Sequence, residues 1–342
     1  MTKSMKKRDS NTGKWEYRDL DRDMFQRELN DFVPDKIYDA HAHLYRTIFW
    51  HSDPDAPYYA FTSPPDVTLE VYREHMAWIF PEREIHGLHS PMALVQDTQP
   101  GNEWVAREIV KDPLARGQLL VKADDDPEWV RQEVKRLGFR GLTPFATYAH
   151  VPNPMEAEIP DYLPEPIMAV ADQEGWSITL HMMRARCAAD ASNQHWIRHY
   201  CQRYPNMQLI LDHCARGFNP YLVLEGLPKL TGLNNLWIDT SYICQPLAVE
   251  AVLRIIGPER TLYGSDFCLS HERGLNFGVA DTFTGVVEGT LRGMDGRSPV
   301  CMLLAGLENL RAIKAACWSA GLKDHQIEQL FWGNATRLMG VQ

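Results

Sequence analysis

The sequence predicts an α/β fold, a (β/α)₈ barrel with insertions after the first and the eighth strand. Short apolar runs rich in Val, Ile, Leu and Phe alternate with helical patterns of ten or more residues, as parallel strands alternate with crossover helices. No glycine-rich nucleotide loop follows an early strand, which disfavours the open doubly wound sheet, the second choice. A length of 342 residues suits a barrel with insertions.

Eight apolar runs make up the predicted barrel. The strands are expected at 36–43, 85–91, 117–123, 139–145, 176–181, 207–213, 236–240 and 261–266. Helical patterns between them cover 127–137, 166–174, 192–204, 222–230 and 247–256. Residues 1–35 are expected to form an N-terminal extension with a leading helix, because apolar residues recur there at helical spacing. Residues 36–342 are then one barrel domain.

Two long connections interrupt the repeat. Residues 44–84 are rich in proline and aromatic residues, and residues 267–300 contain several glycines. Loops at the carboxyl ends of barrel strands build the active site, so both insertions are expected on the functional face. The aromatic residues of the first insertion suit either a lid over the substrate or a subunit interface. They are Tyr45, Phe49, Trp50, Tyr58, Tyr59 and Phe61.

Composition excludes several classes of function. The net charge is −10, from 35 basic and 45 acidic residues, which argues against a nucleic-acid partner. No apolar run is long enough for a membrane span, and the polar N-terminus does not look like a signal peptide. Seven scattered cysteines without a C-x-x-C pair predict reduced thiols, a cytoplasmic location and no cysteine zinc site.

Residues that can bind a metal close several of the predicted strands. His41 and His43 end the first strand, and residues two apart on a strand point to the same face. His181, His213 and Asp266 close the fifth, sixth and eighth strands. Barrel catalytic groups come from the carboxyl ends of several strands, so this pattern predicts one site at that face.

These residues resemble the amidohydrolase superfamily, and within it the single-metal branch related to aminocarboxymuconate-semialdehyde decarboxylase and the γ-resorcylate decarboxylases. The shared pattern is H-x-H on strand one, His on strands five and six, and Asp on strand eight. Residues 333–338, Gly-Asn-Ala-Thr-Arg-Leu, resemble the family's closing helix. The likeness covers roughly residues 36–340.

The resemblance implies a role for each of these residues. His41, His43, His181 and Asp266 would hold a divalent ion, while His213 would contact water or substrate and Asp266 would also move a proton. Imidazoles with one carboxylate suit Zn²⁺, and Mn²⁺ is an alternative. Many superfamily members bridge two metals through a lysine on strand four. Residues 140–145 contain no lysine, so one ion is expected.

Three reactions or roles remain open at this point. The first is hydrolysis of a C–N or C–O bond, in an amide or lactone, by metal-activated water. The second is non-oxidative decarboxylation of an aromatic or unsaturated acid, which uses the same ligands. The third is an inactive barrel that serves as a binding protein. The sequence of residues 214–220, Cys-Ala-Arg-Gly-Phe-Asn-Pro, favours hydrolysis, because the decarboxylases more often carry a short glycine-bearing turn there.

Three arginines follow the fifth and sixth strands: Arg184, Arg186 and Arg216. They are predicted to bind a small, anionic substrate through its carboxylate, or alternatively to form loop salt bridges. Asp190 could pair with one of them. Strand alternation predicts that Asp212 faces away from His213. By analogy with related barrels, the protein is expected to be a homodimer.

Overall fold

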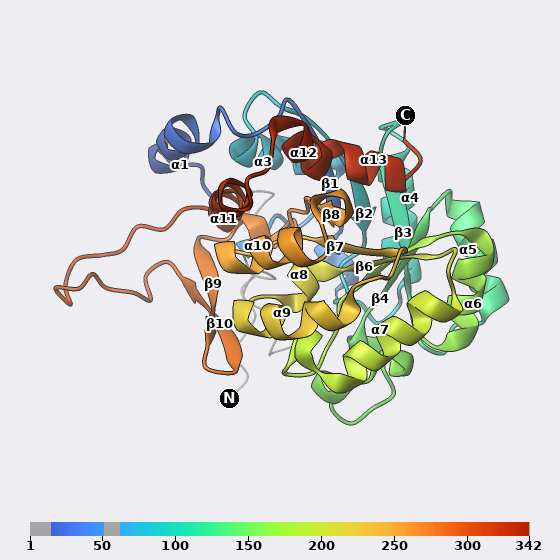
Figure 1. Cartoon of the computed structure of the whole chain (residues 1–342). Coiled ribbons are helices and arrows are strands. Elements are labelled where there is room, and N and C mark those ends of the chain that lie inside the picture. The colour runs from blue at the N-terminus through green and yellow to red at the C-terminus, as the bar shows by residue number, and fades with distance from the viewer. Residues whose placement is uncertain (1–14, 51–61, 342) are drawn as a thin grey trace, which may run out of the picture.

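The computed structural model describes residues 15–50 and 62–341, and it forms the predicted barrel (Figure 1). Eight strands follow one another around a single sheet in chain order, and each neighbouring pair runs parallel. The strands are β1 Lys36–His43, β2 Glu84–Ser90, β3 Arg116–Val121, β4 Gly141–Pro144, β5 Ser177–Leu180, β6 Gln208–Leu211, β7 Leu236–Asp239 and β8 Thr261–Leu262.

The segment after β8 closes the barrel against β1. The prediction of an eighth strand over 261–266 was too long, since β8 has only two residues. The chain nevertheless continues along β1: Ala40 donates its N–H to the Tyr263 carbonyl, and Asp266 donates to the His41 carbonyl at 2.8 Å. These bonds bring Asp266 beside His41 although it lies beyond the strand.

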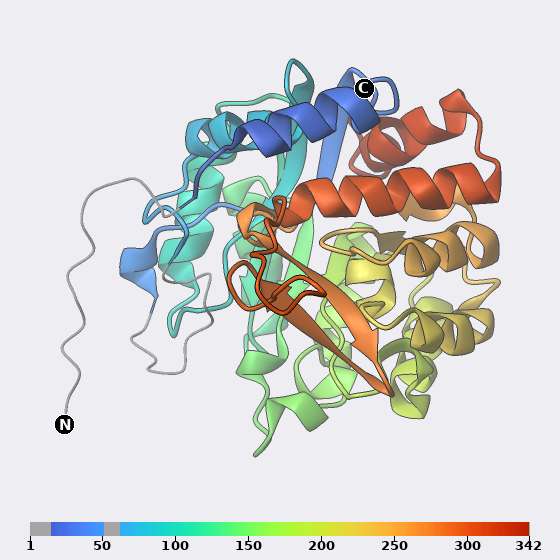
Figure 2. The same cartoon turned by 90° about the vertical axis from the view of Figure 1, so that its left-hand side faces the viewer.

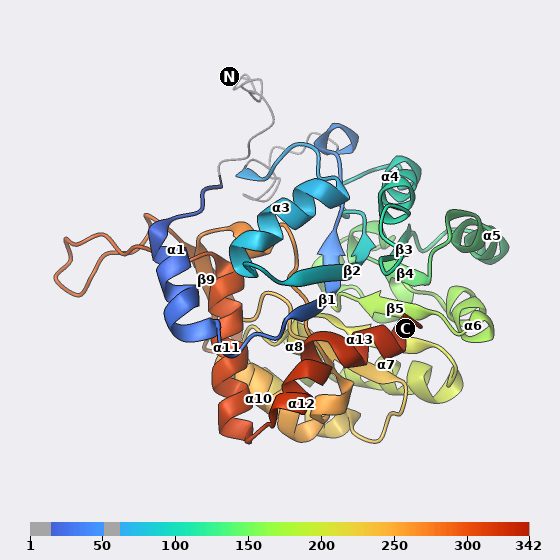
Figure 3. The same ribbon diagram turned by 90° about the horizontal axis from the view of Figure 1, so that it is seen from above.

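Helices cover the outside of the barrel (Figure 3). They are α3 Leu69–Ile79, α4 Gln99–Ile109, α5 Pro127–Leu137, α6 Glu165–Glu174, α7 Ala191–Arg203, α9 Pro220–Gly226, α10 Pro246–Ile255 and α11 Ala305–Ala320. The predicted bounds of α5 are correct because both ends carry strong signals. Asp126 caps the first turn, Pro127 begins the helix, and Gly138 ends it in the left-handed region at φ 69°.

Shorter helices lie at both ends of the chain. An N-terminal pair, α1 Asp19–Met24 and the π-helical η1 Phe25–Leu29, occupies the region of the predicted leading helix. The C-terminal set is α12 Asp324–Glu328, η10 Gln329–Gly333 and α13 Asn334–Leu338. Within residues 15–50 and 62–341, no helix is long and apolar enough to cross a membrane.

The barrel interior has an apolar end and a polar end. At the amino ends of the strands, Tyr38, Leu88, Ile210, Trp237 and Leu262 pack together in one buried cluster. The same cluster includes three residues of the C-terminal segment: Ala335, Met339 and Val341. The polar end lies at the carboxyl ends of the strands and holds the candidate site.

The first insertion, 44–84, contains the 3₁₀ turn η2 Thr47–Phe49 and helix α3. Tyr45 and Trp50 pack with ring centroids 4.9 Å apart, so part of the predicted aromatic cluster does form. Tyr58, Tyr59 and Phe61 lie outside the described residues. The choice between a lid and a subunit interface therefore stays open.

The second insertion, 267–300, contains a hairpin that the sequence analysis did not predict. Strands β9 Gly274–Val279 and β10 Thr282–Val287 pair antiparallel in a separate two-stranded sheet. Figure 2 shows this hairpin crossing in front of the barrel strands, and a long segment projects beyond it in Figure 1. The hairpin lies beside α9 and α10, next to the loops that follow β5, β6 and β7.

Candidate metal centre

Three of the four predicted metal ligands converge at the carboxyl end of the barrel. The Nε2 atoms of His41 and His43 lie 3.9 and 3.6 Å from Oδ1 of Asp266. The three side chains offer ligand atoms that all lie within 4.8 Å of one another. Each residue is at most 5% exposed. Two buried imidazoles and one buried carboxylate therefore converge on a common point.

An irregularity in β1 turns both histidines inward. Tyr38 and Ala40 point into the barrel, and simple alternation would send His41 outward. The register between β1 and β2 shifts between Asp39 and Ala42, which marks a bulge. His41 and His43 thereby join the interior face, and Ala42 packs on the outer cluster instead.

Asp239, at the end of β7, orients His41. Its Oδ2 lies 2.9 Å from Nδ1 of His41, and Oδ1 accepts bonds from the N–H and hydroxyl of Ser241. Burial favours the neutral acid, but the nearby His41 and His213 outweigh it and lower the pKa of Asp239 to about 2. The ionised carboxylate accepts a hydrogen bond from Nδ1–H of His41, which turns Nε2 of the same ring toward Asp266 and the site.

The hydroxyl group of Ser90 orients His43, and neighbouring histidines keep Asp266 ionised. The hydroxyl of Ser90, at the end of β2, lies 3.0 Å from Nδ1 of His43. Asp266 has a positive φ of 54°, a strained conformation that occurs often at functional sites. Burial alone would raise the pKa of Asp266, but His43, His213 and His41 together hold it well below its usual range. Asp266 is thus an ionised carboxylate, which is the form that binds a metal.

His213 begins a left-handed turn directly after β6. Residues 213–216 all have φ between 52° and 59°, which places four consecutive non-glycine residues in the left-handed region. His213 donates its backbone N–H to Asp239, and its Nδ1 lies 3.0 Å from the Ser241 carbonyl oxygen. Burial lowers the pKa of His213, so the ring is neutral.

The prediction that Asp212 faces away from His213 was wrong. Its Oδ1 lies 3.6 Å from Nδ1 of His41, and ligand atoms of His41, Asp212 and His213 lie within 4.8 Å of one another. The chain leaves the strand at Leu211 and enters the left-handed turn, so strand alternation no longer applies. Burial raises the pKa of Asp212 well above its usual range.

His181 lies beside the converging group without belonging to it. Its ring centroid is 5.1 Å from that of His213, and its other side stacks on Phe145 at 5.7 Å. Burial, followed by the charge of Arg216, lowers the pKa of His181 well below its usual value. A neutral imidazole at this position remains available as a ligand, so the role of His181 stays a prediction.

The three arginines differ in their surroundings. Arg184 pairs with Asp190 at 3.0 Å, the partner that the sequence suggested. Arg186 is 39% exposed in its side chain and pairs with Glu225 at 2.6 Å and with Asp281. Both arginines therefore have carboxylate partners of their own, and their contact with a substrate stays a prediction. Arg216 lies near the site, since its charge acts on His181.

The donor set fits one divalent ion. Two imidazole nitrogens and one carboxylate oxygen suit Zn²⁺ and Mn²⁺. No lysine lies on β4, Gly141–Pro144. Sequence reasoning missed the groups behind the ligands, Asp239, Ser241 and Ser90. Asp239 also closes an apolar strand, which was the available signal for it.

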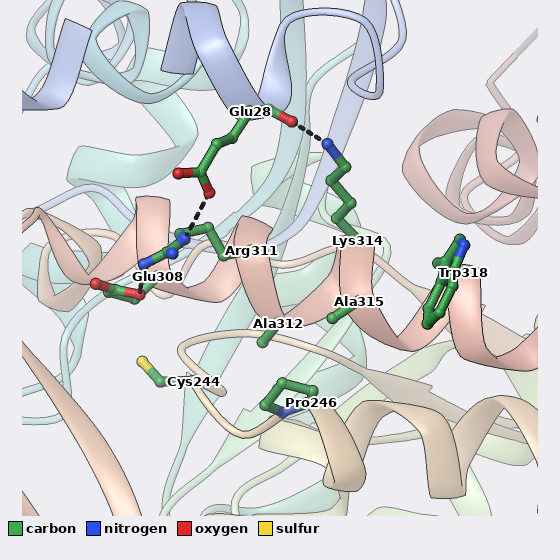
Figure 4. A pocket seen from close by; sticks show the side chains of 9 residues that line it. All are labelled: Glu28, Cys244, Pro246, Glu308, Arg311, Ala312, Lys314, Ala315 and Trp318. Atoms are coloured by element: carbon green, nitrogen blue, oxygen red, sulfur yellow. Dashed lines mark hydrogen bonds and ion pairs between the residues drawn. The ribbon is translucent and has the colours of Figure 1, made fainter. Parts of the chain in front are cut away.

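A cavity of about 520 Å³ lies elsewhere, between η1, α10 and α11 (Figure 4). Its charged groups bond to one another: Arg311 lies between Glu28 and Glu308, and Lys314 donates to the Glu28 carbonyl. None of the residues that line this outer cavity belongs to the candidate centre.

Comparison with solved structures supports the barrel. A 5-carboxyvanillate decarboxylase from Sphingomonas paucimobilis matches with a TM-score of 0.57 and 14% identity, over 90% of this chain and 100% of that chain. A dihydroxybenzoic acid decarboxylase from Polaromonas sp., with manganese and 2-nitroresorcinol bound, matches with a TM-score of 0.55 and 16% identity, over 90% and 98%.

A third structure is described as a probable 2-pyrone-4,6-dicarboxylic acid hydrolase from Acinetobacter baumannii, with citric acid bound. It matches with a TM-score of 0.56 and 15% identity, over 89% of this chain and 99% of that chain. At such identities the likeness shows the fold alone. A search of curated proteins finds no match.

A family model described as Amidohydrolase matches residues 38–341, which include every residue of the candidate centre. The match spans most of the chain and confirms the resemblance drawn from the H-x-H pattern and the strand-end residues. This protein belongs to the amidohydrolase family, in the branch known as amidohydrolase 2.

Proposed function

We propose that this protein is a metal-dependent hydrolase that cleaves a C–N or C–O bond in a small substrate bearing a carboxylate. One divalent ion, Zn²⁺ or alternatively Mn²⁺, would be held by His41, His43, Asp266 and His181. Bound there, the ion would polarise the substrate carbonyl and lower the pKa of a coordinated water to about 7.

The protonation state of His213 carries this proposal. The Ser241 carbonyl can only accept a hydrogen bond, and the nearby Ser241 hydroxyl donates its proton to Asp239, so Nδ1 of His213 bears a proton and Nε2 keeps its lone pair. A neutral imidazole with a free Nε2 can take a proton from an attacking water and pass it to the leaving nitrogen or oxygen. One C–O bond forms, the C–N or C–O bond breaks, and the proton ends on the leaving group.

Arg216 supports the choice of a carboxylate substrate. It is 8% exposed, and its Nη1 donates to the Met182 carbonyl at 2.6 Å. Among the described residues, Nε has no hydrogen-bond partner and no carboxylate pairs with the guanidinium. The Nε–Nη2 edge, which binds carboxylates in a bidentate manner, is therefore unused. A buried cation without a counter-ion suits an anionic ligand.

Decarboxylation of an aromatic or unsaturated acid is the second candidate. Two of the three solved structures described above are decarboxylases of the same fold, and this reaction can use the same metal ligands. That reaction requires a proton donor for the substrate carbon. Asp266, with its low pKa, and the neutral ring of His213 are poor donors, so Asp212, whose pKa is raised well above its usual range by burial, would have to supply that proton.

The deciding experiment is a screen of lactones, amides and aromatic acids with metal-loaded protein in water enriched in ¹⁸O. Hydrolysis places ¹⁸O in the new carboxylate, while decarboxylation releases CO₂ and leaves a product with one carboxylate fewer. CO₂ release without ¹⁸O-labelled hydrolysis product would replace the proposal by the second candidate. Neither product, with no bound metal, would favour an inactive binding protein.

The role of His213 is tested by His213→Asn. We expect the variant to keep its metal and to lose turnover about 10²- to 10⁴-fold, the usual contribution of a general base. His195→Asn, an exposed position on α7, is the matched control and should leave both unchanged. Loss of the metal from His213→Asn would make His213 a ligand and overturn its role as base.

A further inference from the structure

The hairpin β9–β10 is hydrogen-bonded to the loops that follow β6 and β7. Asn219, after β6, donates from Nδ2 to the carbonyls of Ala280 and Thr282 at 2.9 and 2.8 Å. Gln245, after β7, donates to the carbonyl of Asn276 at 3.2 Å. The hairpin, which belongs to the segment after β8, is therefore hydrogen-bonded to neighbouring loops at the barrel mouth.

The hairpin also explains Arg186, which the sequence suggested as a substrate ligand. Arg186, after β5, pairs with Asp281 at the tip of the hairpin and with Glu225 on α9. At the same face, Gly278 approaches Asn219 so closely that an added Cβ would lie 2.8 Å from its Cγ. This fit requires a glycine at that position and shows that the hairpin is seated against the mouth.

One hairpin side chain reaches the unpaired arginine. The guanidinium carbon of Arg216 lies 5.6 Å from the ring centroid of Phe283, at cation–π distance. Phe283 also packs on Phe218, with ring centroids 4.8 Å apart, and Phe218 packs on His213 at 5.2 Å. Aromatic rings thus run from the proposed base to the hairpin, beside the cation.

We propose that the β9–β10 hairpin is the roof of the substrate pocket and that Phe283 determines which carboxylates bind at Arg216. This inference rests on the proposed function, because it takes Arg216 as the carboxylate-binding residue. Phe283 covers one face of the guanidinium, so a carboxylate reaches it only at the Nε–Nη2 edge. The group attached to that carboxylate then lies against Phe283 and Phe218.

The geometry selects one class of ligand. Two flat rings beside a bidentate cation favour a carboxylate joined to a flat aromatic or unsaturated group, which can stack on them. A small aliphatic acid gains the ion pair but not the stacking. The pocket should therefore bind benzoate more tightly than acetate, although both carry the same charge.

The chain offers a matched control on the same hairpin. In the β9–β10 register Phe283 lies opposite Gly278, and Phe277 lies opposite Thr284. Because neighbouring positions on a strand point to opposite faces, Phe277 is on the far face from Phe283. Replacing either phenylalanine by alanine removes the same volume, but only one removal affects the roof over Arg216.

The test measures binding of benzoate and of acetate to the metal-loaded protein by calorimetry. Phe283→Ala should weaken benzoate binding about 10-fold, the size of one lost aromatic stacking contact, and change acetate binding little. Phe277→Ala should change neither. Arg216→Lys should weaken both ligands, because the bidentate edge is lost.

The outcomes separate this inference from the proposed function. If Phe283→Ala leaves the benzoate-to-acetate ratio of Kd unchanged while Arg216→Lys weakens both ligands, the roof is refuted and the carboxylate site stands. If Arg216→Lys changes neither affinity, the carboxylate site itself is refuted, and the role of Phe283 with it. A circular dichroism spectrum like that of the wild type ensures that each variant is folded.

Discussion

The two ends of this barrel are built from the same strands and differ in almost every physical property. Strand β6 leads from Ile210 in the apolar cluster to His213 at the mouth, and β7 leads from Trp237 to Asp239. At the amino ends the interior is a closely packed apolar cluster. At the carboxyl ends, a few residues further on, it holds buried charges and imidazoles.

The difference shows that the apolar end stabilises the fold, whereas the polar end destabilises it. Burial of the apolar cluster stabilises the fold by the hydrophobic effect. The polar end carries costs instead: Asp212 Oδ1 and Arg216 Nε are buried without a hydrogen bond among the described residues, and residues 213–216 and Asp266 have positive φ. Each strained residue costs about 1–3 kcal/mol. Such a site persists because the rest of the barrel holds it in place.

The largest effect on function is expected from Asp266→Ala. Loss of the only carboxylate among the three converging ligands should reduce kcat about 10³-fold or more and release the metal. Elemental analysis and turnover measure both, and Asp97→Asn, at an exposed position, is the control. A variant that keeps its ion and its turnover would show that the polar end is not a metal centre.

The largest effect on stability is expected from the opposite end. Ile210→Ala should lower the free energy of unfolding by about 2–5 kcal/mol, through lost burial and a new cavity. Because Ile210 belongs to the apolar cluster and offers no ligand atom, kcat of the folded fraction should stay close to that of the wild type. Urea unfolding and steady-state kinetics test the two halves. A large fall in kcat at unchanged stability would break the division between the ends.

Sensitivity of the fold to acid should come in part from His271, in the segment that follows β8. Burial lowers the pKa of His271 to about 3. Nε2 of this histidine lies 2.9 Å from the His75 carbonyl oxygen. The folded pKa lies below the unfolded value of about 6.5, so the stabilisation is complete above that pH and is lost as the pH falls toward 3. The loss is about 1.4 kcal/mol per pH unit.

His271→Gln should therefore be less stable at pH 7 but have a flatter dependence of unfolding free energy on pH between 6 and 4. His195→Gln, on the exposed face of α7, is the control and should keep the wild-type slope. An identical slope in His271→Gln would mean that this histidine does not titrate with unfolding.

The smallest effect is expected from Arg186. Its ion pairs are exposed and such pairs contribute only about 0–1 kcal/mol, so Arg186→Ala should change KM about 3-fold or less. Arg216→Lys should raise KM about 10-fold or more, since a buried bidentate contact is lost. Equal effects of the two variants on KM would contradict the distinction between the hairpin contact and the substrate contact.

The sequence predicted the barrel because its strands and helices are marked by local signals. Strand 36–43 and helix 127–137 were correct to the residue, since an apolar run and clear caps define them. Residues 261–266 were predicted as strand, but the bonds of Asp266 depend on β1, which is far away in the sequence. Local patterns contain no information about such a partner.

The candidate site was predictable in its strand-end residues and not in its details. His41, His43 and Asp266 share the pattern of a polar residue after an apolar strand. The orientation of Asp212 was predicted wrongly because the left-handed turn at 213–216 contains no glycine that would have indicated it. The hairpin was missed because β9 and β10 are short, and contacts with distant loops such as Asn219 hold them.

Metal content tests the central claim most directly. Protein dialysed against metal-free buffer after loading should retain about one divalent ion per chain, held at the polar end of the barrel. His43→Ala should lose that ion, whereas Ile210→Ala, in the apolar end, should retain it in its folded fraction. A wild-type protein that binds no ion, or a His43→Ala variant that holds one as tightly as the wild type, would contradict the account.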